Sequence, residues 1–311
     1  MAVAAEQFTR APEPTLTSRV TVLAVIIIPL IAVLAAVPVA WNRWISWLDI
    51  ALALILYVIA AGGITIGYHR YFTHRSFRAK PWVAATLGVA GSLALQGSIA
   101  SWVASHRKHH ANSDEKDDPH SPWKYGTGSW AITKGFLWSH VGWLVAQEPI
   151  DANRWAPDML KRPLTARLSS AFGWLALTTF LLPAVLGGLL TWSWQGALTA
   201  FFWAGLARIA LVHHVTWSIN SVCHIWGKQP FVSRDESRNV AWLALPSLGE
   251  SWHNFHHAEP TSARHGVLPH QVDASAAVIR FAEKRGWVHN VKWPKPERIQ
   301  AKLVQPVTME R

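Results

Sequence analysis

Three short histidine clusters are the part of this sequence best suited to chemistry. They are HRYFTH (His69, His74), HRKHH (His106, His109, His110) and HNFHH (His253, His256, His257). Neutral imidazoles that converge in number bind metal ions. In an HxxHH pattern the three side chains lie at i, i+3 and i+4, on one face of a helix. His69 and His74 do not share a face of a regular helix and require a helix end or a loop. The clusters predict a metal site, and protonated histidines at a membrane surface are the alternative interpretation.

The number and type of these ligands narrow the chemistry. Eight histidines exceed the three or four protein ligands of one zinc ion, so two metals are implied. Imidazole binds zinc, copper, nickel and iron, so ligand type alone does not choose among them. The single cysteine, Cys223, excludes an internal disulfide and cysteine-rich metal sites, and we expect it to pack as a small apolar residue. The chain has only one Glu-x-x-His spacing, Glu250 to His253, and neither an HExxH motif nor a dinucleotide fingerprint.

The elements that carry these clusters are expected to be membrane helices. Half of the 311 residues are hydrophobic, 15% are charged and 20 are tryptophan, a composition typical of membrane proteins with interfacial aromatic belts. A span needs about 20 apolar residues. Four stretches meet that length and predict spans: 20–40, 45–67, 171–192 and 196–219. A fifth apolar stretch, 82–104, is expected to lie along the interface or to dip in and return, because as a span it would separate the first two clusters.

Two spans between the second and third clusters return the chain to the same side, so all three clusters are expected on one face. We predict that this face is cytoplasmic, because basic residues flank the clusters whereas the TWSWQ connector carries no charge. The net charge of +11 is explained by the usual excess of basic residues on the cytoplasmic side of a membrane protein and by attraction to anionic lipids. A further interpretation is that the basic residues form a docking surface for a polyphosphate-bearing substrate or an acidic electron carrier. No nucleic-acid partner is expected. Residues 1–296 are predicted to form one membrane-bound domain, and residues 297–311 a C-terminal tail.

The order and separation of five motifs resemble a known family. HRYFTHRSF, HRKHHANSDEKDDPHSP, SHVGW, NSVCH and GESWHNFHH are similar to those of the bacterial members of the integral-membrane acyl-CoA desaturases of the stearoyl-CoA Δ9 type, from about Gly62 to Gly266. The resemblance implies an all-α fold, a four-span transmembrane helical bundle with a cytosolic cap that carries a histidine-ligated di-iron site. It implies two irons per chain held by nine histidines, the eight above and His224, with Asn220 reaching one iron through water.

The same resemblance implies an activity and its partners. The reaction is oxygen-dependent removal of two hydrogens from an acyl chain such as stearoyl- or palmitoyl-CoA, giving a cis double bond at Δ9 in the bacterial cell membrane. No side chain needs to act as a nucleophile. Without a cytochrome b5-like segment, electrons are expected from a separate ferredoxin or flavin-type NAD(P)H oxidoreductase. Four residues are implied to line the bend of an acyl tunnel, with interfacial packing as the alternative: Gln96, Trp102, Thr216 and Trp217.

Two departures from the family pattern concern the substrate headgroup. Ala104 and Ser105 stand where animal members carry an Arg-Asp pair that contacts coenzyme A, so headgroup contacts must differ and another thioester carrier stays open. A membrane alkane or fatty acid hydroxylase is the enzymatic alternative, against which NSVCH argues. A membrane metal carrier is the non-enzymatic alternative, against which the one-sided clustering argues.

The remaining polar residues are expected to have structural roles. Arg208 lies within the fourth span and is expected to be paired or functional rather than exposed to lipid. His213 and His214 are expected to be interior and hydrogen-bonded, and the resemblance places His120 and His140 near the ligands or in the cap. The acidic run at residues 114–118 is expected to balance charge or cap a helix rather than bind metal. Three histidines are expected at the surface: His265, His270 and His289.

Overall fold

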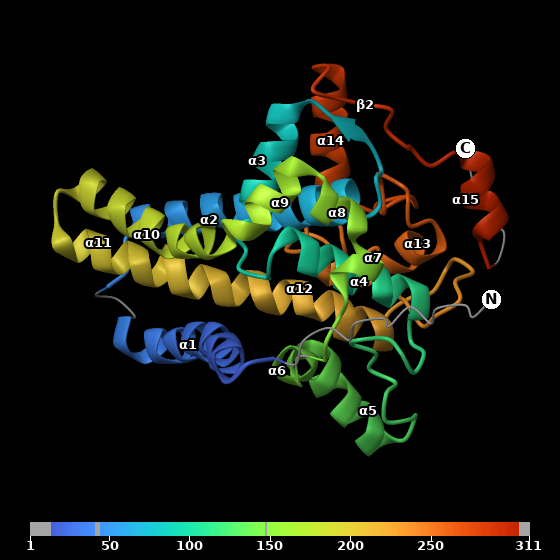
Figure 1. Ribbon diagram of the computed structural model, residues 1–311, viewed down its shortest axis with the longest axis horizontal. Coiled ribbons are helices and arrows are strands. Elements are labelled where there is room, and N and C mark those ends of the chain that lie inside the picture. The colour runs from blue at the N-terminus through green and yellow to red at the C-terminus, as the bar shows by residue number, and fades with distance from the viewer. Residues whose placement is uncertain (1–13, 41–43, 147, 305–311) are drawn as a thin grey trace, which may run out of the picture.

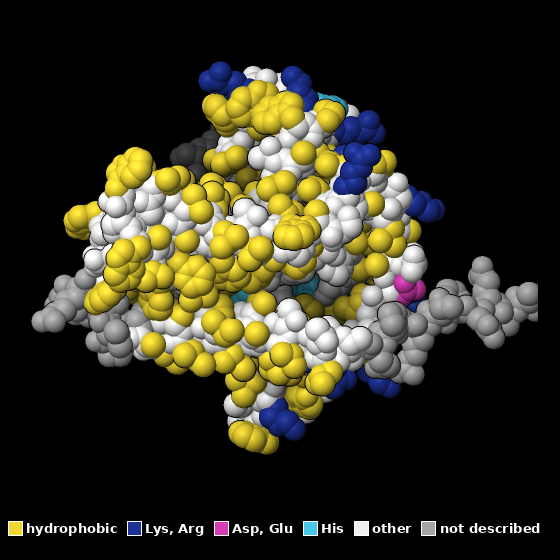
Figure 2. Space-filling model, turned by 60° about the vertical axis from the view of Figure 1, so that its left-hand side comes forward, with side chains coloured by type: hydrophobic (Ala, Val, Ile, Leu, Met, Phe, Trp, Pro, Cys, Tyr) yellow, Lys and Arg dark blue, Asp and Glu magenta, His cyan; other side chains and the backbone are white. Residues whose placement is uncertain are grey.

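Long helices lie along one axis of the molecule, and short helices and loops gather at one end of them (Figure 1). The computed structural model describes residues 14–40, 44–146 and 148–304. Hydrophobic side chains cover the left and centre of the view in Figure 2, whereas lysine and arginine side chains lie at its top, along its upper right and at its bottom. The fold is mostly helical, as the sequence predicts.

Within the described residues, four helices are long and apolar enough to cross a membrane. They are α1 (Leu16–Ala40), α2 (Trp47–Gly62) with the π-helix η1 (Gly63–Thr73), α10 (Phe172–Thr191), and α11 (Trp194–Ala200) with the π-helix η3 (Phe201–Ala207) and α12 (Arg208–Ile225). Each predicted span coincides with one of these helices, but the second and fourth helices continue to Thr73 and Ile225 instead of ending at residues 67 and 219. Because of this extension, the ends of two spans carry His69 and His224 directly into the cap.

The fifth apolar stretch forms two short helices, α3 (Pro81–Ser92) and α4 (Ile99–Asn112), and is not among the candidate spans of the described residues. Leu95 and Gly97 turn the chain between them with φ values of 59° and 95°, a region that favours glycine. Helix α3 approaches η1 very closely, since a Cβ on Gly63 would lie 2.1 Å from the backbone nitrogen of Gly91. This approach places the start of α4 beside the histidines of η1.

Arg208 stabilises the turn between α3 and α4 from within the fourth span. Its guanidinium is 3% exposed and donates hydrogen bonds to the carbonyl oxygens of Leu93 and Thr179, at 3.2 and 3.0 Å. It also donates to the Thr179 hydroxyl and to the carbonyl of Ala204, both at 2.9 Å. His213 is hydrogen-bonded to the next carbonyl of the turn, that of Ala94, at 2.9 Å. The predictions of a paired arginine and an interior histidine are both confirmed.

The cap consists of short elements around the ends of the spans. They are α5 (Ser129–Leu137), η2 (Trp138–Gly142), α6 (Trp143–Ala146), α7 (Ala152–Trp155), α8 (Pro157–Lys161), α9 (Pro163–Ser170), η4 (Ala241–Leu243), α13 (His253–Ala258), α14 (Ala274–Lys284), α15 (Pro296–Lys302), and the strands β1 (Arg78–Ala79) and β2 (Val288–His289), which pair in antiparallel fashion. The largest apolar core joins η1 and α4 to α14 through Tyr68, Phe72, Ile99 and Ile279. Cys223 packs in a smaller apolar cluster, as predicted.

The described part of the C-terminal segment packs on the cap. Helix α15 is connected through a hydrogen bond from the Val232 amide to the Lys302 carbonyl at 2.8 Å, and Arg298 pairs with Glu259 at 2.8 Å. The end of the predicted tail, residues 305–311, lies outside the described residues. The division of the chain at residue 296 stays a prediction.

Candidate metal centre

A π-helix brings the first histidine pair together. In η1 the hydrogen bonds connect residue i to residue i+5, and the backbone amide of His74 bonds to the carbonyl of His69 at 3.1 Å. A turn of a π-helix takes more residues than a turn of an α-helix, so the imidazoles, five residues apart, project from nearly the same side, with ring centroids 4.8 Å apart. The helix ends at Thr73 and His74 follows it as the cap residue, in line with the expected helix end, but the π-helical turn was not expected.

The other two histidine clusters lie on short helices, each of which is held in place by a hydrogen bond to a polar side chain. The Ser98 hydroxyl accepts a hydrogen bond from the Ser101 amide and begins α4, which carries His106, His109 and His110. Helix α13 begins at His253, and the buried Asn254 fastens it by accepting from the Phe231 amide at 2.7 Å. Both HxxHH segments are thus short helices on rigid supports.

The structure divides each HxxHH segment between two groups of ligand atoms. The first group consists of His69, His74, His106, His110 and His256, and the second of His109, His224, His253 and His257. Within each group the candidate ligand atoms all lie within 4.8 Å of one another. In HRKHH, His106 and His110 (i and i+4) belong to the first group and His109 (i+3) to the second. In HNFHH the division is reversed, because His253 and His257 belong to the second group and His256 to the first. All nine predicted ligands lie in these two groups.

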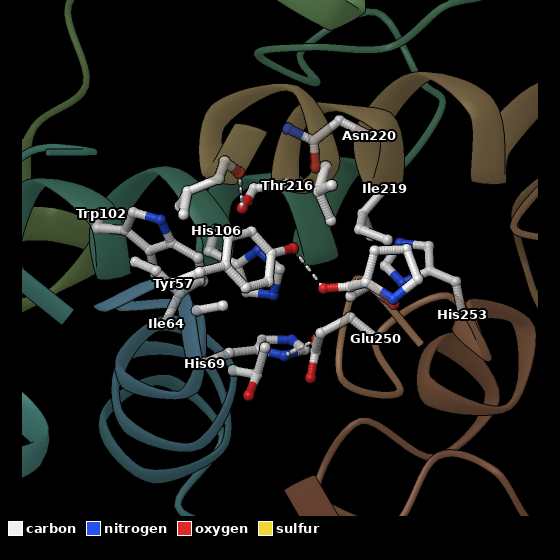
Figure 3. Close-up of a pocket in the computed structure, with 16 residues that line it drawn as sticks. Tyr57, Ile64, His69, Trp102, His106, Thr216, Ile219, Asn220, Glu250 and His253 are labelled. Carbon is white, nitrogen blue, oxygen red and sulfur yellow. Dashed lines mark hydrogen bonds and ion pairs between the residues drawn. The ribbon is translucent and has the colours of Figure 1, made fainter. Parts of the chain in front are cut away.

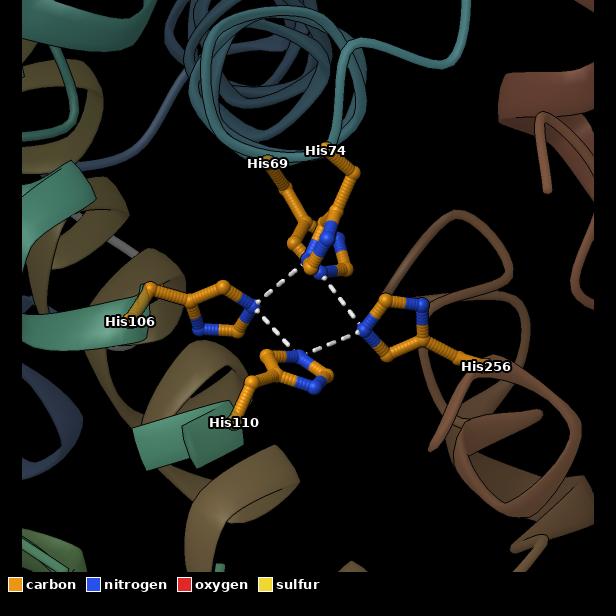
Figure 4. Close-up of side chains that lie close together, drawn as sticks. All are labelled: His69, His74, His106, His110 and His256. Atoms are coloured by element: carbon orange, nitrogen blue, oxygen red, sulfur yellow. Dashed lines mark hydrogen bonds between the residues drawn. The ribbon is translucent and has the colours of Figure 1, made fainter. Parts of the chain in front are cut away.

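In the first group the imidazole nitrogens face a common centre (Figure 4). The Nε2 atom of His106 lies 3.1 Å from those of His74 and His110, and that of His256 lies 3.0 Å from His69 and 2.9 Å from His110. In the second group the Nε2 atom of His253 lies 3.2 Å from that of His224 and 3.0 Å from that of His257.

Carboxylates on the outer nitrogens leave the inner nitrogens of these histidines free to bind a cation. Nδ1 of His109 lies 3.0 Å from Asp118, Nδ1 of His224 2.9 Å from Asp114, and Nδ1 of His257 2.6 Å from Asp235. A neutral imidazole that donates from Nδ1 has only a lone pair at Nε2. Lone pairs that meet at 3 Å repel, and the buried Nε2 of His109 has no hydrogen-bond partner. A metal cation satisfies all of these nitrogens.

The protonation states agree with metal binding. Burial, and after it the charge of neighbouring histidines, lowers the pKa of six candidate ligands well below the ordinary value: His74, His106, His110, His253, His256 and His257. Imidazole must be neutral to bind a metal. The acidic residues Asp114 and Asp118 contact histidines instead of pointing into the groups, in line with the expected balance of charge.

An apolar pocket lies directly against the histidines. Figure 3 shows His69, His106 and His253 on its wall together with Asn220. Apolar side chains of the spans complete it: Ala61, Ile64, Val212, Val215 and Ile219. The Tyr57 hydroxyl closes one side by donating a hydrogen bond to the Pro246 carbonyl at 2.6 Å. The pocket therefore presents an apolar wall next to histidines of both groups.

Two of the four predicted tunnel residues line this pocket. Trp102 and Thr216 lie on its wall, and Trp102 stacks on His106 with ring centroids 4.9 Å apart. Gln96 is not on the wall, but its side-chain oxygen accepts a hydrogen bond from Trp102 Nε1 at 3.4 Å. Trp217 is also outside the pocket wall and stacks on His213, at 4.8 Å. Their contact with a substrate stays a prediction.

The prediction that His265 lies at the surface is wrong. Its side chain is fully buried, and its ring centroid lies 4.5 Å from that of His256 and 5.5 Å from that of His69. The segment after α13 is held against η1 because Arg70 of η1 donates to the Ala263 carbonyl at 3.0 Å and to Nδ1 of His265 at 3.2 Å. His270 and His289 are exposed, as predicted.

The role of Glu250 is not visible in the sequence. The sequence shows only the Glu-x-x-His spacing of Glu250 with His253, whereas the carboxylate contacts Nδ1 of His69. Among the other histidines, His120 lies beside Asp118, with its ring centroid 4.3 Å from that of His109. His140 contacts His214 and Ser221, at 3.0 and 2.9 Å.

Comparisons with known proteins agree with this site. The model of the family described as fatty acid desaturase matches residues 45–292. The chain is 36% identical over 278 residues to a hex-5-enoyl-[acyl-carrier protein] acetylenase of Moorena producens, covering 89% of this chain and 87% of the relative. It is 38% identical to an sn-1 stearoyl-lipid 9-desaturase of Anabaena variabilis, with 79% and 85% covered. It is 37% identical to Delta-9 acyl-lipid desaturase 1 of Arabidopsis thaliana, with 80% and 77% covered. From the family match and from this similarity along most of its length, the chain belongs to the fatty acid desaturase family.

Proposed function

We propose that this protein is a membrane-bound, oxygen-dependent desaturase that introduces a cis double bond at Δ9 of a saturated acyl chain. The observation that carries the proposal is the position of two all-histidine groups beside an apolar pocket. A C–H bond of an unactivated methylene resists acid–base attack, so the reaction needs a redox metal rather than a nucleophilic side chain. The hydroxylase alternative uses a similar metal site and differs in its product.

Two irons are the proposed cofactor. Five histidines are available to one ion and four to the other. Asn220, which lines the pocket together with His253 of the second group, is proposed to reach one ion through a water molecule. When bound, the irons would supply the activation of O2 that breaks the two C–H bonds. Nine imidazoles without a thiolate ligand are compatible with iron among other metals, and membership of the family favours iron.

The chain's own residues position the substrate and exclude water. The apolar wall formed by Ile64, Val212 and Ile219 would hold the acyl chain by burial of its methylene groups, worth about 0.8 kcal/mol each. Trp102 and Thr216 are proposed to set the bend of the chain beside the irons. The bond from Tyr57 to the Pro246 carbonyl closes the pocket wall and helps to keep water out.

The carrier of the acyl chain is proposed to be coenzyme A, as in stearoyl- or palmitoyl-CoA. Two of the relatives are named for acyl chains carried by lipids and one for an acyl-carrier protein. Ala104 is fully buried on α4, so it offers no charged contact to a headgroup. These observations make a lipid-bound acyl chain the alternative carrier.

The proposed location is a bacterial cell membrane with the histidine groups on the cytoplasmic side. Basic residues near the clusters support that orientation: Arg70, Arg75, Arg78, Lys80, Arg107 and Lys108. The pocket and the metal groups lie at one end of the spans, where a ferredoxin or a flavin-type NAD(P)H oxidoreductase in the cytoplasm would deliver electrons.

Expression in a host that lacks its own desaturase, together with a candidate reductase, tests the proposal. Mass spectrometry of total fatty acids should show a new cis double bond at Δ9 that is absent with His110→Ala. A hydroxylated product would support the hydroxylase instead. Purified protein supplied separately with stearoyl-CoA, a stearoyl phospholipid and stearoyl-acyl-carrier protein should use the coenzyme A ester fastest, and faster use of the phospholipid would refute the proposed carrier.

A further inference from the structure

A fully buried arginine lies next to the first group of histidines. Arg70 follows His69 in η1 and donates from Nε and Nη2 to Glu250 Oε1, at 3.2 and 3.1 Å. Its Nη1 donates to Asp273 Oδ1 at 3.1 Å and to the Ala263 carbonyl at 3.0 Å. The other oxygen of Glu250 contacts Nδ1 of His69. One guanidinium thus connects two carboxylates, and only one of these carboxylates touches a candidate ligand.

We propose that Glu250, held in place by Arg70, is a positioning residue for His69. The carboxylate keeps the proton of His69 on Nδ1, so that the Nε2 lone pair faces the first group. It also fixes the rotation of the ring about its side-chain bonds. Carboxylates that orient a metal-bound histidine in this way typically change metal affinity by about 10–100-fold when they are removed. The inference rests on the metal centre of the proposed function.

The surroundings of Glu250 argue that it orients a ligand and does not bind a metal itself. His69, Glu250 and His265 lie close enough to form a third ligand group. However, Oε1 of Glu250 is occupied by Arg70 and Oε2 by His69. Arg70 Nη2 also donates to His265 Nδ1, at 3.2 Å, and an arginine can only donate, so this nitrogen offers its lone pair to the guanidinium. A metal ion there would face a buried positive charge at contact distance.

The two carboxylates partnered with Arg70 have different tasks. Asp273 accepts from the Ala276 amide at 2.9 Å and so begins α14, and it also binds the amide of His265. Gly249 lies against it with φ near 100°, and a Cβ at that position would meet Asp273 Oδ1 at 2.6 Å. Asp273 therefore fixes backbone segments, whereas Glu250 fixes a ligand. This difference provides a matched pair of variants.

The test compares Glu250→Gln with Asp273→Asn in the full-length protein. Each change neutralises one of the two carboxylates that pair with Arg70, with little change of side-chain volume. Only Glu250→Gln also removes the carboxylate that contacts His69. The metal-free proteins are reconstituted with Fe(II) or Co(II), metal per chain is measured by mass spectrometry, and affinity is measured by chelator competition. The absorption spectrum of the Co(II) protein reports the ligand geometry of each bound ion.

We expect Glu250→Gln to lower the affinity for one of the two metal ions by about 10–100-fold. The absorption spectrum of Co(II) at that position should change, whereas the spectrum of the other ion should not. Asp273→Asn should lower the thermal midpoint more than Glu250→Gln does, and should leave the affinity within about threefold of wild type. Unchanged affinity in Glu250→Gln, or equal losses in both variants, would overturn the inference. Wild-type protein that binds no metal would instead overturn the proposed function, and the inference with it.

Discussion

Replacing His106 and His256 together should remove no more metal than replacing either one alone. These residues are 150 positions apart in the chain, yet both belong to the first group of histidines and neither belongs to the second. By contrast, His106 and His109 are three residues apart on α4 but belong to different groups. Each replacement by glutamine should therefore affect the ion of one group only.

The expected magnitude follows from the grouping. Loss of a carboxylate partner weakens metal binding by about 10–100-fold, so loss of a direct ligand should cost at least that much, about 1.4–2.8 kcal/mol. Each single variant should then retain roughly one metal per chain at limiting metal. The pair His106→Gln/His256→Gln should also retain roughly one, because the same ion is already lost, whereas His106→Gln/His109→Gln should retain close to none.

Metal analysis of the purified variants by mass spectrometry measures these numbers directly. Circular dichroism of the metal-free proteins serves as the control for folding. The reasoning would be refuted by the opposite pattern, in which His106→Gln/His109→Gln keeps one metal and His106→Gln/His256→Gln keeps none. That result would mean that each HxxHH segment binds its own ion.

Three further outcomes are expected. Arg208→Met should destabilise the fold by about 2–4 kcal/mol, seen as a lower thermal midpoint in detergent, because buried carbonyls lose a charged donor; an unchanged midpoint would contradict the role of Arg208. Thr216→Phe should fill the pocket and lower desaturation about tenfold with metal content unchanged, whereas Thr178→Phe on the exposed face of α10 should have no effect. Partial burial raises the pKa of Asp158, but hydrogen bonds from Arg107 and Arg75 outweigh it and hold that pKa well below its usual range. Asp158 therefore stabilises the fold above pH 4, and the difference in thermal midpoint between wild type and Asp158→Asn should shrink as the pH falls below about 4; a constant difference would exclude this ion pair as its source.

The spans and the candidate ligands were predictable because they depend on local patterns. A run of about 20 apolar residues predicts a bilayer span regardless of its neighbours, and the histidine motifs imply a metal site from residue type and number alone. The second and fourth spans proved longer than their apolar runs, because the helices that carry His69 and His224 continue beyond the expected membrane boundary. Hydropathy does not report where a helix ends once it leaves the lipid and packs against protein.

His265 and Glu250 show a different limit of prediction. Nothing near His265 in the sequence distinguishes it from the exposed His270, because its burial depends on Asp273 and Arg70, which lie in other elements. Glu250 was visible only as part of a spacing with His253, yet its contact is with His69, 181 residues earlier in the chain. Contacts between distant segments leave no local pattern.

By itself, the sequence determined the mostly helical fold with its candidate membrane spans and the histidines that gather in it, and it predicted two metals. Only the tertiary structure decided which histidines belong to the same group. On a helix, the side chains at i and i+4 project in nearly the same direction, and the side chain at i+3 projects in a different one. Which histidine group each side chain joins depends on how α4 and α13 face each other. The relative placement of helices is set by packing and by buried charges such as Arg70, and these are properties of the whole fold.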